Sequence, residues 1–127
     1  MLKRAIIWFE KYNKLSWIIV LLTAIFIFYI SSLTFSLNFQ KTFSLKSYIY
    51  HFVIFFIFSL FFLISAIKGK KISNFIWFLI IIILILYAVL DEFHQYFVPG
   101  RSCSLRDVIT DSLGIFFALI SYKLKLL

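Results

Sequence analysis

The feature that most constrains this chain is an uncharged run, FLIIIILILYAVL, at residues 78–90. It belongs to one of four apolar segments, which lie at roughly Leu15–Ile30, Tyr48–Ile67, Asn74–Leu90 and Leu105–Tyr122. A helix needs about 20 residues to cross the ~30 Å hydrocarbon core of a bilayer, and each segment meets this length once flanking Trp, Tyr and Lys residues are counted. Open strands would leave backbone groups unpaired in lipid, and barrel strands are shorter and alternate in polarity. We therefore expect four transmembrane helices.

The composition is typical of a membrane protein rather than a soluble one. Of the 127 residues, 64% are hydrophobic and 14% are charged, whereas a soluble domain has about half its residues apolar and about a quarter charged. A soluble core of this size could not bury so many Phe, Ile and Leu side chains. We expect one all-α, multi-pass domain over residues 1–127. Within it, residues 1–14 form a cytoplasmic or interfacial segment that can lie flat at the headgroups.

The distribution of basic residues indicates the orientation of the chain. The lysines lie in short segments between apolar runs, so the net charge of +8 favours membrane lipid as a partner and not nucleic acid. Nine of the 13 basic residues fall in the N-terminal segment, the loop after the second helix and the C-terminus. Because basic residues accumulate in cytoplasmic loops, both termini are expected to be cytoplasmic, and the loops around residues 31–47 and 91–106 to face outwards. No convincing cleavage site follows the first segment, which favours a retained helix over a signal peptide.

In this orientation, polar residues from distant parts of the sequence reach the same membrane face. His51 lies just inside the outer start of the second helix, and the stretch DEFHQYFVPGR at residues 91–101 follows the third. Asp107 and Asp111 lie in the first turns of the fourth helix. Ionisable residues inside a membrane are costly, and they mark functional sites or internal pairs. The sequence therefore predicts one polar site beneath the outer headgroups.

Asp107 and Asp111 are four residues apart and share one face of the last helix. Ser104 and Asp107 have the S-x-x-D form of a capping box, so Asp107 has a structural alternative as a helix cap, although a helix N-terminus also accepts phosphate. Asp111 lies about one turn deeper, where a carboxylate needs a partner, and both function and simple pairing stay open for it. Its candidate partners are His51, Arg101 and Arg106.

If the third helix continues past its apolar run, Glu92, Gln95 and Tyr96 form one polar face. Asp91 then lies on a neighbouring stripe, where a solvated helix end explains it best. Glu92 and His51 could act as an acid–base pair, because a half-dry environment can tune each of them. A histidine beside carboxylates also permits a metal, but the acid–x–histidine spacing in this stretch is not a strong ligand pattern. We therefore assign no metal ligand and expect no cofactor.

The stretch DEFHQYFVPGRSCSLRDVITDSLG, at residues 91–114, resembles the signature of the VanZ-like family, which runs approximately E-x-x-Q-x-F-x-P-x-R and then D-x-x-x-[N/D]-x-x-G. The matching residues are Glu92, Gln95, Phe97, Pro99, Arg101, Asp107, Asp111 and Gly114. Upstream, residues 46–56 resemble the family's D-K-x-x-H-F segment, so His51 carries over, although Lys and Ser stand where Asp and Lys are usual. The resemblance implies a small polytopic protein of the bacterial cytoplasmic membrane, in a family whose named member is associated with teicoplanin resistance.

Two functions fit these residues. In the first, the outer site binds an anionic headgroup of a lipid or of a cell-wall precursor and processes it, as a hydrolase or transferase acting on lipid-linked phosphate. In the second, the same groups form an ion-pair network that fixes helix packing, and the protein acts without catalysis by binding a glycopeptide or assisting a partner. A transporter is disfavoured, because no polar series crosses the midplane. For the first function, the expected catalytic residues are His51, Glu92, Gln95, Asp107 and Asp111, and the expected substrate-binding residues are Arg101, Ser104 and Arg106.

Overall fold

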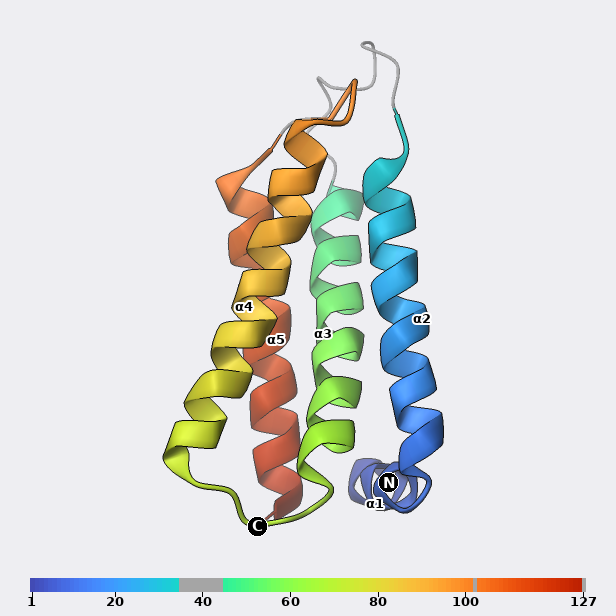
Figure 1. Cartoon of the computed structure of the whole chain (residues 1–127), viewed down its shortest axis with the longest axis vertical. Helices are drawn as coiled ribbons and strands as arrows, with labels where there is room; N and C mark the ends of the chain where they lie inside the picture. Colours follow the sequence, from blue (N-terminus) through green and yellow to red (C-terminus); the bar gives the residue numbers. More distant parts are fainter. Residues whose placement is uncertain (35–44, 102, 127) are drawn as a thin grey trace.

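A computed structural model describes residues 1–34, 45–101 and 103–126 of the chain. Over these residues it contains five α-helices and no strand, which confirms the all-α prediction. The helices are α1 (Leu2–Lys11), α2 (Asn13–Ser32), α3 (Leu45–Ile67), α4 (Asn74–Tyr96) and α5 (Leu105–Leu126). Helices α2 to α5 run alternately up and down, and both termini lie at the same end (Figure 1). We call this the proximal end; the distal end is formed by the last turns of α2 and α4 and the first turns of α3 and α5.

Three of the helices, α2, α3 and α4, are long and apolar enough to cross a membrane. They correspond to the first three predicted spans, and α4 continues past its apolar run to Tyr96, so that the stretch from Asp91 to Gln95 is helical. Helix α5 has 22 residues but is not among these candidates, and its first turns carry Arg106, Asp107 and Asp111. Its other two charges, Lys123 and Lys125, lie in its last turn at the proximal end, so residues 112–122 between them are uncharged.

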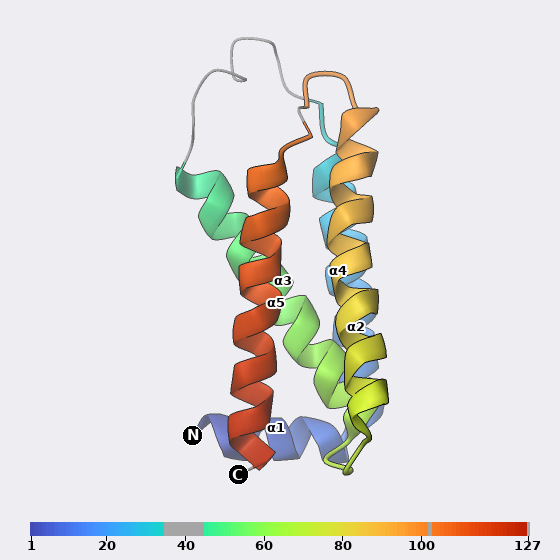
Figure 2. The same cartoon turned by 90° about the vertical axis from the view of Figure 1, so that its left-hand side faces the viewer.

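Helix α1 lies across the proximal end of the bundle (Figure 2). It is amphipathic: Ile6 is fully buried against the bundle, whereas Trp8 is half exposed. At the end of α1, Glu10 forms an ion pair with Lys125 of α5 at 2.6 Å, and the Tyr122 hydroxyl donates to the same carboxylate at 2.6 Å. These contacts hold the N-terminal segment against the end of the last helix.

Helix α3 forms the centre of the bundle. In its most apolar stretch 50% of the residues are buried inside the protein, compared with 22% in α2 and in α4. Helix α5 packs closely on α3 at Gly114, where an added Cβ atom would lie 2.5 Å from the carbonyl oxygen of Phe52. Only glycine allows so close an approach of two backbones. This contact brings the preceding turn of α5, with Asp111, against the first turns of α3.

The basic residues are divided between the two ends of the bundle. The nine that the sequence assigns to one side lie in α1, at the start of α2, between α3 and α4 and at the end of α5, all at the proximal end (Figure 1). Lys46, Arg101 and Arg106 belong to the distal end. Lys41 and most of the predicted loop at 31–47 lie outside the described residues.

Candidate functional site

The distal end gathers most of the predicted site residues inside the bundle. His51 comes from α3, Glu92 and Gln95 from α4, and Asp111 from α5, and all four side chains are buried. Asp107 lies one turn before Asp111 and is partly buried. Because α3 and α5 both begin at the distal end and α4 ends there, residues 60 positions apart in sequence come into contact. We call these five residues the distal cluster.

The deepest contact of the distal cluster joins His51 to Asp111. The Nδ1 atom of His51 lies 2.9 Å from Oδ1 of Asp111, and the two residues are 3% and 0% exposed. Of the three partners considered for Asp111, the structure therefore selects His51. An ionised carboxylate can only accept, so this hydrogen bond requires a proton on Nδ1, and in a neutral imidazole Nε2 is then the acceptor of the ring. The other carboxylate oxygen of Asp111 is buried, with no hydrogen-bond partner among the described residues.

A second set of hydrogen bonds joins α4 to the end of α2. The Ser31 hydroxyl donates to Oδ1 of Asp91 at 2.6 Å. The amide nitrogen of Gln95 donates to Oδ2 of Asp91 at 3.1 Å and to Oε1 of Glu92 at 3.0 Å. The prediction of a solvated helix end at Asp91 is therefore wrong. Asp91 is only 8% exposed, because the last turn of α2 covers this side of α4.

Tyr96 does not belong to the polar face of α4 that the sequence predicts. Its side chain is 69% exposed, whereas Glu92 and Gln95 are buried. Each residue is displaced by about 100° around a helix from the one before it, so Tyr96 leaves the buried side that Gln95 occupies. The prediction of a shared face is correct for Glu92 and Gln95 and wrong for Tyr96.

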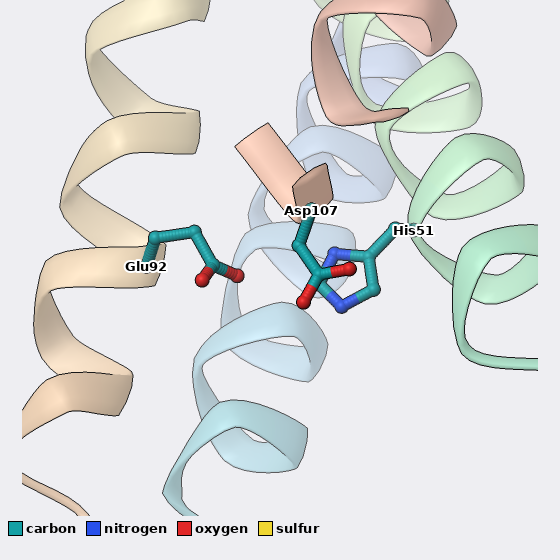
Figure 3. Close-up of side chains that lie close together, drawn as sticks. All are labelled: His51, Glu92 and Asp107. Carbon is teal, nitrogen blue, oxygen red and sulfur yellow. The ribbon is translucent and has the colours of Figure 1, made fainter. Parts of the chain in front are cut away.

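Glu92 also holds the start of α5. The backbone N–H of Ser104 donates to Oε2 of Glu92 at 2.9 Å. In a capping box, this amide would be accepted by the acid three residues later, which is Asp107. The acid that accepts it here comes from α4 instead, and the carboxylate of Asp107 turns towards His51 and Glu92 (Figure 3). Asp107 therefore does not accept the Ser104 amide as a capping box would require, although it lies in the first turn of α5, where the helix dipole favours a carboxylate.

Arg101 closes the end of α2. Its Nε donates to the carbonyl oxygen of Leu33 at 3.1 Å, and a terminal guanidinium nitrogen donates to the carbonyl oxygen of Ile30. The last carbonyls of a helix lack partners within the helix, so Arg101 acts as a cap supplied from the loop after α4. Burial lowers the pKa of the Arg101 guanidinium, while the nearby Asp91 carboxylate opposes this effect. Arg101 thus lies near the Asp91 and Glu92 carboxylates, at the end of the molecule where the sequence predicts it.

The two remaining predicted binding residues lie at the edge of the site. Ser104 is partly buried and contacts Glu92 through its backbone. Arg106 is exposed on the first turn of α5. The structure thus brings Ser104 against the distal cluster and leaves Arg106 at its rim.

None of the predicted site residues lies in α2, yet the structure shows that α2 contributes to the site. Ser31 reaches Asp91, and the neighbouring Ser32 hydroxyl lies 3.0 Å from Nε2 of His94. The ring of His94 also stacks on Phe28, with ring centroids 4.6 Å apart. The available signal is the pair of serines that follows the apolar run of α2. Their role depends on which face of α2 meets α4, and the sequence does not contain that information locally.

Three residues of the distal cluster are arranged as metal ligands could be. His51, Glu92 and Asp107 each offer one ligand atom, and these atoms all lie within 4.8 Å of one another. They come from α3, α4 and α5 and turn towards a common point (Figure 3). An imidazole and two carboxylates can also exchange protons and receive an anionic group beside Arg101.

Comparison with known proteins identifies the family of the chain. No curated protein and no solved structure shows a significant match. A family model described as VanZ/LLP1 matches residues 7–126, which cover nearly the whole chain. The match confirms the resemblance indicated by the signature at residues 91–114, and it is at the distal end that the structure collects the polar residues of that signature. The chain therefore belongs to the VanZ/LLP1 family.

Proposed function

We propose that this protein lies in the bacterial cytoplasmic membrane with both termini in the cytoplasm and its distal end at the outer leaflet. Three helices of membrane-spanning length and the accumulation of basic residues at the proximal end support this topology. Helix α5 would be the fourth span. Its length of 22 residues suffices, and its deepest charge, Asp111, is buried against α3 rather than exposed to lipid.

Labelling of Cys103 tests the proposed topology. It is the only cysteine in the sequence and is exposed in the loop at the distal end. A membrane-impermeant maleimide should label it in intact cells. Because desolvation and the nearby Glu92 carboxylate raise the pKa of this thiol, labelling should be slow, and the incubation is lengthened at neutral pH because maleimides hydrolyse and attack amines in alkaline buffer. As a control, Lys70→Cys in a Cys103→Ser background should react only after permeabilisation. The reverse pattern would contradict the orientation.

We further propose that the distal cluster binds the anionic headgroup of a lipid or of a lipid-linked cell-wall precursor and processes it as a hydrolase or transferase. The supporting observation is that buried ionisable side chains from three helices meet at one point of an apolar bundle. Such groups are costly in a membrane and mark functional sites. In this proposal His51 and Glu92 exchange protons, Gln95 orients the substrate or water, and Asp111 orients His51. Arg101 and the start of α5 hold the anion.

A groove beside the distal cluster would suit the apolar part of such a substrate. It has a volume of about 400 Å³ and lies between α2 and α3, where it is lined by Phe26, Lys46, Ile49, Tyr50, Val53 and Ile54. Tyr50 connects it to the site, because its ring packs against that of His51 with centroids 5.6 Å apart. Apolar walls with a lysine among them fit a hydrocarbon chain whose headgroup is anionic. The groove therefore favours a lipid substrate over a water-soluble one.

Binding of a lipid phosphate tests the proposal. The purified protein in nanodiscs is titrated with a polyprenyl phosphate and, as the matched control, with the corresponding uncharged polyprenol. The phosphate should bind about tenfold more tightly or better, which is the effect of one charge-assisted hydrogen bond. Glu92→Gln should retain binding but abolish any turnover. Equal affinity for the phosphate and the alcohol would contradict an anion site.

The structural alternative is favoured by one observation. The hydrogen bonds from Ser31 through Asp91, Gln95 and Glu92 to Ser104 join three parts of the chain and would fix helix packing by themselves. On this view the protein acts without catalysis, by binding a glycopeptide or assisting a partner. The alternative predicts that Glu92→Gln leaves the effect of the protein on teicoplanin susceptibility unchanged when membrane abundance is normal. Loss of that effect at normal abundance would favour the catalytic function.

A further inference from the structure

We propose that His51, Glu92 and Asp107 bind a divalent transition-metal cation of the Zn²⁺ or Mn²⁺ class, with Asp111 as the residue that positions His51. This inference goes beyond the proposed function, because the cation can bind whether or not an anionic headgroup follows it. It assigns to the distal cluster a cofactor that the spacing of residues in the sequence does not indicate.

The arrangement of the donor atoms carries the proposal. One ring nitrogen and two carboxylate oxygens, from three different helices, lie within 4.8 Å of one another. Ligand atoms that surround Zn²⁺ at about 2.0–2.2 Å are about 3.3 Å apart, so the longest separation in the cluster needs to shorten by up to about 1.5 Å. Asp107 can make most of this movement, because no described residue forms a hydrogen bond with its carboxylate. Imidazole and carboxylate together suit Zn²⁺ and Mn²⁺.

The pairing of His51 with Asp111 supplies a second, independent observation. Metal-binding histidines usually donate their other ring N–H to a carboxylate, which fixes the tautomer and the direction of the ring. Here Nδ1 of His51 lies 2.9 Å from Asp111 Oδ1, which leaves Nε2 with its lone pair. The histidine is 3% exposed, and no described residue forms a hydrogen bond with Nε2. A cation would complete the site between this ring nitrogen and the two carboxylates that it faces (Figure 3).

The charges around His51 also favour a bound cation. Glu92, Asp107 and Asp111 place three carboxylates around one imidazole, and two of these carboxylates are fully buried. Carboxylates this close repel one another unless protons or cations compensate them. A bound divalent cation would offset this repulsion and become the largest local charge in the site.

The metal would also leave room for a substrate. Three protein ligands with an open fourth position are typical of catalytic rather than structural zinc sites. An anionic headgroup could occupy that position beside Arg101. This extension rests on the anion-binding part of the proposed function, and in it His51 and Glu92 act as metal ligands in place of exchanging protons. The histidine two residues after Glu92, His94, is engaged elsewhere, since Ser32 lies 3.0 Å from its Nε2 and Phe28 stacks on its ring. The ligand comes instead from a different helix.

Equilibrium dialysis with the metal alone tests the proposal. The full chain, purified in detergent and stripped with a chelator, is dialysed against Zn²⁺ or Mn²⁺. One ion per chain is expected. Asp107→Asn should weaken binding at least tenfold, whereas the matched control His94→Asn should bind as the unaltered protein does. Absence of binding, an unaffected Asp107→Asn variant, or equal losses in both variants would overturn the proposal.

X-ray absorption of the Zn²⁺-loaded, unaltered chain gives a test that needs no variant to fold. The spectrum should show one imidazole with oxygen ligands, and a sulfur ligand would assign the metal to Cys103 and overturn the proposal. Asp111→Asn should lower the affinity about 10–100-fold while keeping the imidazole signal; unchanged affinity would overturn the positioning role. Polyprenyl phosphate binding that persists in chelator would separate the two proposals, because it sustains the anion site and removes the metal from it.

Discussion

The double variant His51→Leu/Asp111→Leu should unfold at a higher temperature than either single variant. His51→Leu leaves a fully buried carboxylate without its partner, which costs about 3–5 kcal/mol. Asp111→Leu leaves the buried Nδ1–H of His51 without an acceptor, which costs about 1–3 kcal/mol. Replacing both by apolar side chains removes the buried charge altogether, and such replacements are often neutral or stabilising. The thermal unfolding temperatures of the unaltered protein, the two single variants and the double variant, measured in one detergent, give this cycle.

The cycle also distinguishes a functional pair from a structural one. A double variant as stable as the unaltered protein, but unable to bind metal or polyprenyl phosphate, would show that the pair is not needed for folding. Losses that simply add in the double variant would contradict this expectation and assign the pair to helix packing. Leu113→Ala serves as the control on α5, because Leu113 is exposed and should change stability little.

Glu92→Ala should be among the most destabilising substitutions in α4. The change removes the acceptor of two hydrogen bonds, one from the backbone N–H of Ser104 at 2.9 Å and one from Gln95 at 3.0 Å. Each buried donor left without a partner costs about 1–3 kcal/mol, so the total loss should be about 2–6 kcal/mol. The free energy of unfolding, measured by denaturant titration in detergent, checks this value.

The matched variant for this prediction is Glu92→Gln, which keeps a carbonyl oxygen for the Ser104 amide and should lose clearly less stability. Phe93→Ala, at an exposed neighbouring position, controls for general effects of truncation on α4. If Glu92→Gln and Glu92→Ala were equally destabilised, the charge of Glu92 rather than its hydrogen bonds would hold α4 to α5. An unaffected Glu92→Ala variant would show that this contact does not stabilise the fold.

The helices were largely predictable, because helix formation in a membrane depends on local properties. An apolar run of sufficient length must satisfy its own backbone hydrogen bonds, so α2, α3 and α4 follow from composition and length. Helix α5 was harder to classify, since Asp107 and Asp111 interrupt its apolar character. Of these two residues only Asp111 is buried, where it contacts His51 of α3. The continuation of α4 to Tyr96 was a conditional prediction that the structure confirms.

The membership of the candidate site was also predictable, whereas its contacts were not. His51, Glu92 and Asp111 were placed at one end of the molecule by topology alone. The partner of each was not determined, because partner choice depends on the rotation of each helix about its axis. Asp91 is an example. Its position at the end of α4 suggests exposure to solvent, but α2 covers it and the Ser31 hydroxyl donates to it.

The sequence by itself determined that this is an all-helical protein of a membrane-spanning kind, with basic residues on one side and a VanZ-like polar site on the other. These properties follow from run length, charge and motif, which are readable along the chain. Only the tertiary structure decided that Glu92 accepts the hydrogen bond of the Ser104 amide and that the Asp107 carboxylate lies near His51. It also decided that Asp111 pairs with Nδ1 of His51. The physical reason is the close approach of α3 and α5 at Gly114, which sets the depth and rotation at which these side chains meet.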